Sequence, residues 1–254
     1  IKVNYQGIGS GGGINQLIKK TVDFGGTDAF MTDKELKEAG VPVLHVPTCL
    51  GAVVVTYNLP DNPKLNFTQE LVADIFLGKI KKWNDRRIAA VNQDANLPDL
   101  EITVVHRADG SGTTWIFTNY LKKVSPEWNE KVGSGKTVSW PTGVGGKGNE
   151  GVAALVKKTE GAVGYVEYAY AIRERLKYVR LQNAAGKFVT PSIQAFQAAA
   201  SNADWENAPG FFLNLTDQPG EKSWPICGVS YILIYRDQPQ ASKADAMLKF
   251  FDWC

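Results

Sequence analysis

Short apolar runs alternate with amphipathic segments along most of this chain. The apolar runs predict buried strands over residues 53–57, 102–106, 162–166 and 231–235, and weaker strand patterns cover residues 3–6 and 23–25. Apolar residues at helical spacing predict helices over residues 70–77, 115–123 and 152–158. Strands that alternate with helices are typical of α/β layers, so we expect an α/β fold with largely parallel sheets.

Two distant segments have a similar order of residues. Pro47-Thr48-Cys49 leads into the apolar run Ala52–Tyr57, and Pro225-Ile226-Cys227 leads into Val229–Tyr235. We interpret these two strands as connections between two lobes. One lobe then comprises residues 58–230, and the other is discontinuous, with residues 1–57 and 231–254.

The composition is ordinary for a soluble globular protein, with 254 residues of which 44% are hydrophobic and 21% charged. A net charge of +2 is too small to indicate a nucleic-acid or membrane partner. No apolar run approaches the roughly 18 to 20 residues that a membrane helix needs. One basic cluster is interpreted as a solvated helix end, with a docking face for a partner protein as the alternative; it contains Lys79, Lys81, Lys82, Arg86 and Arg87.

Cysteine and histidine give no pattern of a cofactor site. Cys49, Cys227 and Cys254 are too few for a disulfide framework. His45 and His106 have no metal-ligand companion at a useful spacing. We therefore expect no metal and no cofactor.

A glycine-rich turn, Gly7–Gly13, is predicted between the first strand and a helix that continues through Ile14. Glycines let the backbone approach a ligand closely, and the helix that follows begins with unpaired N–H groups. Gly9 and the hydroxyl of Ser10 make this turn a candidate anion site. A plain flexible turn is an equal alternative, since the dinucleotide-binding pattern is not matched.

The segment Arg107–Thr113 carries a second set of anion donors between a predicted strand and helix. A guanidinium fork, the hydroxyls of Ser111 and Thr113, and the backbone N–H of Gly112 suit a tetrahedral oxyanion. Asp109 is expected to orient Arg107. A capped helix with a surface Arg–Asp pair is the alternative.

Asp28 follows the glycine pair of a third loop and is the unusual member of an anion site. Phosphate keeps at least one proton near neutral pH, so a carboxylate can accept a hydrogen bond from it, whereas sulfate would meet an unpaired repulsive contact. Asp28 is therefore predicted to discriminate between the two anions.

Two other patterns imitate enzyme motifs. Gly133–Thr137 resembles the end of a P-loop, but Glu130 stands where the first glycine is required. A Ser111–His106–Asp28 triad lacks the nucleophile-elbow pattern. The glycine-rich run Gly143–Gly148 with Lys147 is either part of the cleft mouth or an ordinary loop.

Across nearly its whole length the chain resembles the phosphate-binding proteins of bacterial phosphate-specific ABC transporters. The matching stretches are Val3–Ser10, Thr21–Gly25, Arg107–Thr113, Gly145–Gly148, Gly164–Tyr170 and Lys249–Trp253. The resemblance implies a two-lobed periplasmic-binding-protein fold of type II with two crossing hinge strands. It also implies hinge closure on phosphate, delivery to a membrane permease, export to the periplasm and no catalytic residues.

The resemblance also carries over site residues. It implies phosphate contacts at Ser10, Asp28, Arg107, Ser111, Gly112 and Thr113, with Asp109 and Gly9 in support. Its crossing strands run antiparallel, so a disulfide between Cys49 and Cys227 is not expected; a Cys49–Cys254 bond stays open, and free thiols are preferred.

Relatives of this kind begin with a further strand and helix before the position of Ile1, and continue beyond Trp253. Their first loop holds a Thr-Phe pair that also contacts phosphate. We expect two open strand edges where the first strand is missing, filled by a second chain, a swapped copy or residues outside this sequence.

Three alternatives remain open at this point. The first is a receptor for another oxyanion: Asp28 argues against sulfate and molybdate, but arsenate shares the protonation of phosphate. The second is a phosphoryl-transfer enzyme, which the lack of metal ligands and of a P-loop disfavours. The third is a sensory or scaffold fragment that keeps the fold and binds nothing.

Overall fold

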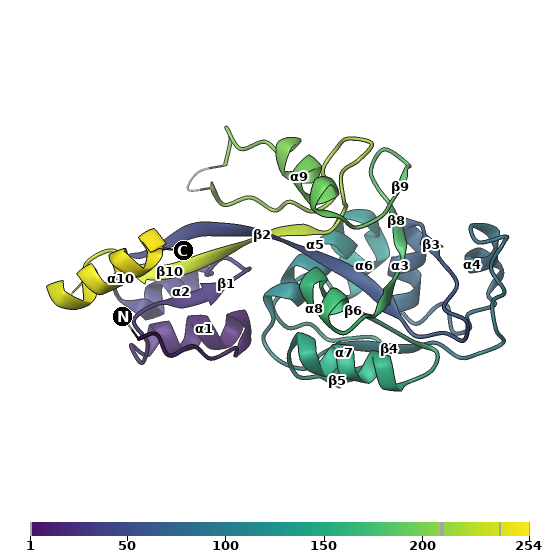
Figure 1. Cartoon of the computed structure of the whole chain (residues 1–254), viewed down its shortest axis with the longest axis horizontal. Coiled ribbons are helices and arrows are strands. Elements are labelled where there is room, and N and C mark those ends of the chain that lie inside the picture. The colour runs from purple at the N-terminus through teal and green to yellow at the C-terminus, as the bar shows by residue number, and fades with distance from the viewer. Residues whose placement is uncertain (1, 209–210, 239, 254) are drawn as a thin grey trace.

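A computed structural model describes residues 2–208, 211–238 and 240–253 and has two lobes of unequal size (Figure 1). In the small lobe lie α1 (Gly9–Ile18), β1 (Gly25–Thr27), α2 (Asp33–Ala39) and α10 (Ala241–Trp253). Two long strands, β2 (Val43–Tyr57) and β10 (Cys227–Tyr235), run from it into the large lobe. Both ends of the chain lie at the small lobe.

The large lobe contains the central part of the chain. Its strands are β3 (Asn66–Phe67), β4 (Thr103–Arg107), β5 (Val144–Gly146), β6 (Ala162–Glu167), β7 (Lys177–Tyr178), β8 (Arg180–Gln182) and β9 (Phe188–Val189). Its helices are α3 (Gln69–Phe76), α4 (Arg86–Ala90), α5 (Gly112–Val124), α6 (Pro126–Lys131), α7 (Gly148–Lys158), α8 (Tyr168–Arg173) and α9 (Ile193–Ser201).

One seven-stranded sheet runs through both lobes in the order β1-β10-β2-β6-β4-β5, with β7 also paired to β2. The first part of β2 pairs with β10, and its last five residues pair with β6. The expectation of largely parallel sheets is wrong. Within this sheet only the β4–β5 and β4–β6 pairs are parallel among the described strands. The crossing strands return through the same sheet and therefore pair antiparallel, as the resemblance implied.

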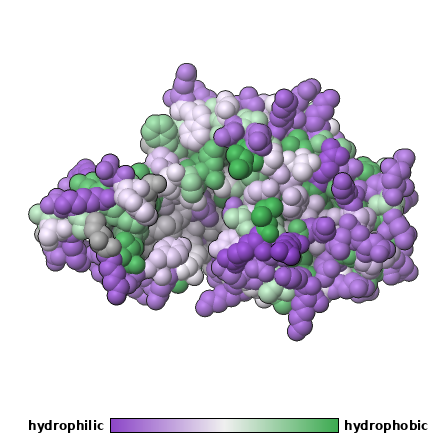
Figure 2. All heavy atoms as spheres, in the orientation of Figure 1, coloured by the Kyte–Doolittle hydropathy of each residue, from purple (hydrophilic) through white to green (hydrophobic). Residues whose placement is uncertain are grey.

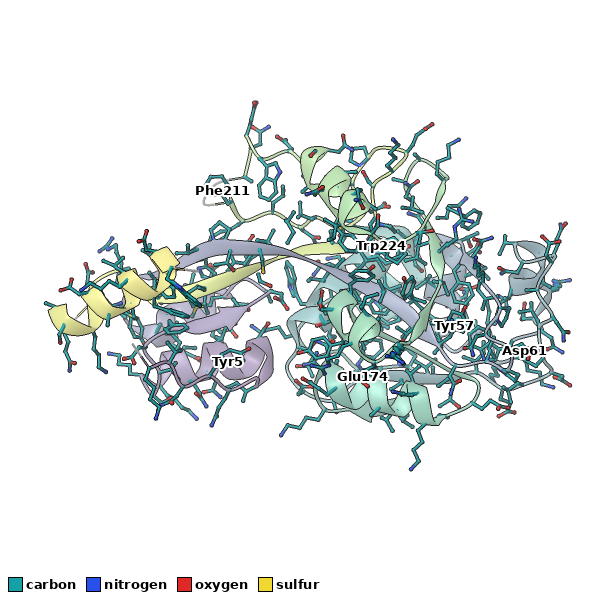
Figure 3. All side chains as sticks on the ribbon, viewed as in Figure 1. Tyr5, Tyr57, Asp61, Glu174, Phe211 and Trp224 are labelled. Carbon is teal, nitrogen blue, oxygen red and sulfur yellow. The ribbon has the colours of Figure 1, made fainter. Side chains whose placement is uncertain are left out.

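Each lobe has its own hydrophobic core. The small-lobe cluster is formed by Ile14, Leu17, Met31, Ala39 and Leu233. The much larger second cluster includes the fully buried Trp83, Trp128 and Trp224. The indole N–H of Trp224, three residues before β10, donates to the Val53 carbonyl of β2 at 2.9 Å and so links the segment before β10 to β2 (Figure 3). Residues 52–55 and 57 of β2 already belong to the large cluster, and the lobe boundaries stay a prediction.

The sequence located α3, β4, α5, α7 and β6 in the large lobe and misassigned the start of the chain. Residues 3–6 form no strand, and the predicted glycine turn is largely the first part of α1. The strand expected at residues 23–25 lies at Gly25–Thr27. Because β1 pairs directly with β10, the two open edges expected there are not present. Among the described strands, β1 is one edge strand of this sheet and β5 is the other.

Cys49 and Cys227 are free thiols, the first exposed and the second buried. Cys49 is opposite Ser230 and Cys227 is opposite Ala52, so the two lie several residues apart along the strand pair rather than at its opposite ends. The proposed partner Cys254 falls outside the described residues. No helix in the described ranges is both long and apolar enough to cross a membrane. The same ranges contain no group of three His, Cys, Asp or Glu side chains that could hold a metal ion.

Candidate functional site

A cavity of about 1,040 Å³ lies between the lobes and is lined from both sides. In Figure 2 the surface is indented between the small lobe on the left and the large lobe on the right. The small lobe contributes Ser10 and Asp28 to the lining, and the large lobe contributes Arg107, Gly112 and Thr113.

Arg107 is a buried cation at the site, and Asp109 holds its side chain in place. It ends β4 with only 5% of its surface exposed. Its Nε and Nη2 groups donate to the two carboxylate oxygens of Asp109 at 2.8 and 2.6 Å. The Gly148 N–H donates to the same carboxylate at 3.0 Å. Burial opposes ionisation of Asp109, but these hydrogen bonds and the guanidinium charge together hold its pKa below the usual range.

The N-terminus of α5 supplies backbone N–H groups beside this cation. Ser111 is the N-cap, and its Oγ accepts a hydrogen bond from the Thr114 N–H at 3.0 Å. The Thr114 hydroxyl is 2.6 Å from the hydroxyl of Tyr165, which accepts from the Arg107 N–H at 3.2 Å. The end of β4 and the start of α5 are thus joined through one buried tyrosine. The first N–H groups of any helix have no partner within the helix and can donate to an anion.

On the small-lobe side, Asp28 follows β1 directly and Ser10 lies in the first turn of α1. The Asp28 N–H donates to the Ser10 hydroxyl at 3.0 Å. The Asp28 Oδ1 accepts from the hydroxyl of Ser230 on β10 at 2.5 Å. Burial raises the pKa of Asp28, while the Ser230 hydroxyl and the Arg107 charge oppose that rise.

The two sides meet at Gly112. A Cβ atom added there would lie 2.3 Å from the Ser10 Oγ and 2.5 Å from the Asp28 Oδ2. Contact continues at Gly11, whose N–H donates to the Gly110 carbonyl at 2.9 Å. In this arrangement only a glycine fits at the start of α5, and the Asp28 carboxylate therefore lies directly against the first turn of that helix.

The structure thus brings the sequence-predicted residues to one place. Ser10, Asp28, Arg107, Gly112 and Thr113 line the cavity. Gly9 lines the cavity too, against the Asp109 carboxylate. Asp109 and Ser111 lie behind the lining, Asp109 bonded to Arg107 and Ser111 fully buried as the N-cap of α5. Their roles as ligand contacts stay predictions.

Three residues near the site were not found from sequence patterns: Ser230, Asn149 and Glu167. Asn149 donates to the Thr113 hydroxyl at 3.3 Å and accepts from the Glu167 N–H at 3.1 Å. Asn149, Glu167 and Ser230 all line the cavity. Glu167 lies within the stretch that carries the family resemblance, but for Ser230 no sequence pattern was available, because its partner is 202 residues away.

The residues of the other sequence motifs, namely the possible triad, the P-loop-like run, the second glycine-rich run and the basic cluster, have the following surroundings. His106 is 3.0 Å through its Nδ1 from the Arg107 carbonyl and stacks on Trp140 at 4.8 Å, so it does not join a triad. Lys136 of the P-loop-like run pairs with Glu35 at 2.6 Å. Gly148 lines the cavity but Lys147 does not. In the basic cluster, Lys79, Lys82 and Arg87 are each paired with acidic side chains.

The whole chain, residues 1–254, matches the family model described as a PBP superfamily domain. The phosphate-binding protein PstS of Pasteurella multocida is 54% identical over 254 residues, which cover 99% of this chain and 73% of the relative. The protein of the same name from Haemophilus influenzae is 51% identical over 99% of this chain and 75% of its own length.

Solved structures agree at the level of the fold. The crystal structure of a DING protein matches with a TM-score of 0.78 at 20% identity, over 97% of this chain and 78% of that one. An ABC-type phosphate transport receptor from Vibrio cholerae matches with a TM-score of 0.57 at 20% identity, over 99% and 82%. This chain therefore belongs to the PBP superfamily and, within it, to the family of phosphate-binding proteins named PstS.

Proposed function

We propose that this chain binds inorganic phosphate between its two lobes and delivers it to the permease of an ABC transporter. The observation that carries the proposal is the position of Asp28, whose Oδ2 lies against Gly112, at the start of the helix that supplies N–H donors. A donor-only site would suit any oxyanion, whereas a carboxylate among the donors suits an anion that still holds a proton.

Three kinds of donor would contact the anion: a guanidinium, backbone N–H groups and hydroxyls. The Arg107 guanidinium, aligned by Asp109, supplies positive charge and directed N–H groups. The N–H groups of residues 112 and 113 add the N-terminus of α5. The hydroxyls of Ser10, Ser111 and Thr113 complete the proposed shell. The Ser111 Oγ already accepts from Thr114, which leaves its O–H to donate.

Delivery needs a site that closes and opens. The connection between the lobes consists of β2 and β10, which run side by side from the small lobe into the large one (Figure 1). Hinge movement about this strand pair would separate Gly112 from Asp28 and so release the ligand. The ligand leaves chemically unchanged, and we assign no residue a catalytic role. We also propose an exported, periplasmic location, because this role belongs there.

Arsenate is the alternative ligand, because it shares the geometry and protonation of phosphate. Isothermal titration calorimetry with phosphate, sulfate and arsenate at neutral pH tests the proposal. Phosphate should bind tightly and sulfate should give no heat. Equal binding of sulfate and phosphate would remove the role of Asp28, and no heat with any of the three would favour a scaffold fragment that keeps the fold without a ligand.

A further inference from the structure

Ser230 makes the shortest described side-chain contact to the carboxylate of Asp28, from a strand that no anion-binding motif includes. Its hydroxyl donates to the Asp28 Oδ1 at 2.5 Å. We infer that Ser230 is a positioning residue, which fixes the Asp28 carboxylate with one oxygen occupied and the other facing the anion, and thereby sets the selectivity for protonated oxyanions. This inference rests on the proposed function and extends it.

The strand register explains why the two side chains meet. In the β1–β10 pair, Thr27 is opposite Tyr231 and Gly26 is opposite Ile232. Continued by one residue, this register puts Asp28 opposite Ser230. Side chains directly opposite each other on antiparallel strands lie on the same face as close neighbours.

An irregularity in the crossing strands holds Ser230 in place. The β10–β2 register shifts there, since Ser230 is opposite Cys49 while Tyr231 is opposite Pro47, and Thr48 is the extra residue. Proline has no N–H for the ladder, which favours an interruption at this point. The Thr48 hydroxyl donates to the Ser230 carbonyl at 2.9 Å. Bulges of this kind redirect side chains. Through Ser230, this bulge connects the Asp28 carboxylate to the two crossing strands.

The two oxygens of Asp28 consequently have different tasks. Oδ1 takes the Ser230 hydroxyl, and Oδ2 is the oxygen beside Gly112. Without the hydroxyl, the carboxylate would be free to rotate about its last torsion, which is broad and roughly two-fold. Both oxygens would then compete for the same N–H groups and the same ligand proton.

The charge of Asp28 also depends on this bond. Burial raises the pKa of Asp28, and the Ser230 hydroxyl is the larger of the two groups that oppose the rise, ahead of the Arg107 charge from β4. Glu167 at the end of β6 is a second acid near enough for the two carboxylates to repel each other. Removal of the hydroxyl therefore raises the pKa of Asp28 further, so the carboxyl group becomes protonated at a higher pH.

A protonated Asp28 is a donor, and it can then serve an anion that carries no proton. Sulfate is such an anion, so wild-type protein should begin to bind sulfate as the pH falls through the pKa of Asp28. In Ser230→Ala the onset of sulfate binding should move to higher pH. A merely structural role of Ser230 would weaken all anions alike and leave this onset in place.

The test is calorimetric titration of wild-type, Ser230→Ala and Ser230→Thr with phosphate and with sulfate across a pH series. Ser230→Ala should bind phosphate about tenfold more weakly at neutral pH, as expected for a lost hydrogen bond to a charged group. Ser230→Thr keeps a hydroxyl and should restore both the affinity and the pH onset. Cys49→Ala is the matched control, because it removes a side chain at the register partner of Ser230.

A second measurement decides the inference without a ligand. Carboxyl-carbon NMR of the unliganded protein follows the titration of Asp28 directly, and its pKa should be higher in Ser230→Ala than in wild type or Ser230→Thr. An unchanged titration, or an unchanged sulfate onset, overturns the inference. If wild-type protein bound no phosphate, the proposed function would fail, and the titration would still decide whether Ser230 controls Asp28.

Discussion

The two lobes contribute opposite kinds of groups to one site. The large lobe presents Arg107 and the N-terminus of α5, both held by buried partners such as Tyr165. These groups are donors and carry positive charge. The small lobe presents Asp28, an acceptor with negative charge, from the end of a three-residue strand that is held by Ser230 and Ser10.

This difference separates affinity from selectivity. In the proposed function, the large lobe provides the attraction that any oxyanion would feel, on a framework anchored in the larger core. The small lobe would then distinguish anions that still hold a proton, through the Asp28 carboxylate. Hinge closure would bring the two contributions together, and the following substitutions test the contribution of each lobe separately.

The largest effect is expected for Arg107→Ala. It removes a buried guanidinium and leaves Asp109 without its partner, so phosphate binding should weaken by about 2–5 kcal/mol. The phosphate affinity of Arg107→Lys should lie between those of wild type and Arg107→Ala, since an ammonium keeps the charge but cannot form the two-bond pair with Asp109. Calorimetry measures both, with circular dichroism to verify folding. Near wild-type affinity in Arg107→Ala would mean that the anion binds elsewhere.

Asp28→Asn tests the small lobe's half of the comparison. Phosphate should lose about 1.5–3 kcal/mol because a charged acceptor is replaced by a neutral amide. Sulfate should gain affinity at neutral pH, since the amide can donate to it. Competition between the two anions in one calorimetric series gives the ratio. Loss of phosphate and sulfate in equal proportion would show that Asp28 supports the fold rather than the selection.

Gly112→Ala tests whether the two halves must touch. The new methyl group would overlap the Ser10 Oγ and the Asp28 Oδ2, so the closed state should be destabilised by about 1–3 kcal/mol. Phosphate affinity should fall while the thermal midpoint of the unliganded protein changes little. Gly26→Ala is the control, since no atom lies within 4 Å of a Cβ built there. Equal affinities in the two variants would contradict lobe contact at Gly112.

Sequence patterns predicted the large lobe better than the small one, for a physical reason. Its elements have long apolar runs that specify their own type: the predicted helix at 70–77 and strand at 162–166 match α3 and β6 within a residue or so. In the small lobe, the glycines of α1 look like a turn because each is a poor helix former. A Cβ on Gly13 would lie 2.7 Å from the Gly26 carbonyl, so close packing explains this glycine instead.

The site was predictable where its groups are contiguous. Arg107 through Thr113 form one loop, and their chemistry can be read together. The pairing of this loop with Asp28 came from the family resemblance and from the chemistry of the anion. Ser230 could not be predicted, because its role depends on strand register between β1 and β10 and on the bulge beside Pro47.

The smallest effect is expected at a second contact between the lobes, the ion pair of Glu35 on α2 with Lys136 at 2.6 Å. The Lys136 carbonyl accepts from the Ser111 N–H at 2.9 Å, so the pair joins the small lobe to the base of the anion-binding loop. Glu35→Gln keeps an acceptor for the N-cap of α2 and removes the charge. Phosphate affinity should fall by about 0.5–1 kcal/mol, and the difference should shrink in high salt.

The pH dependence of this pair has a definite sign. Partial burial opposes ionisation of Glu35, but the hydrogen bond from Lys136 and the capping contacts outweigh it and lower the pKa. The contribution is complete above the ordinary pKa of a glutamate and is lost as pH falls through the lowered one. Glu38→Gln is the matched control, since Glu38 pairs with Lys34 inside α2 at 3.8 Å and spans no gap between lobes. If both variants changed phosphate affinity equally, net charge rather than closure of the lobes would be responsible.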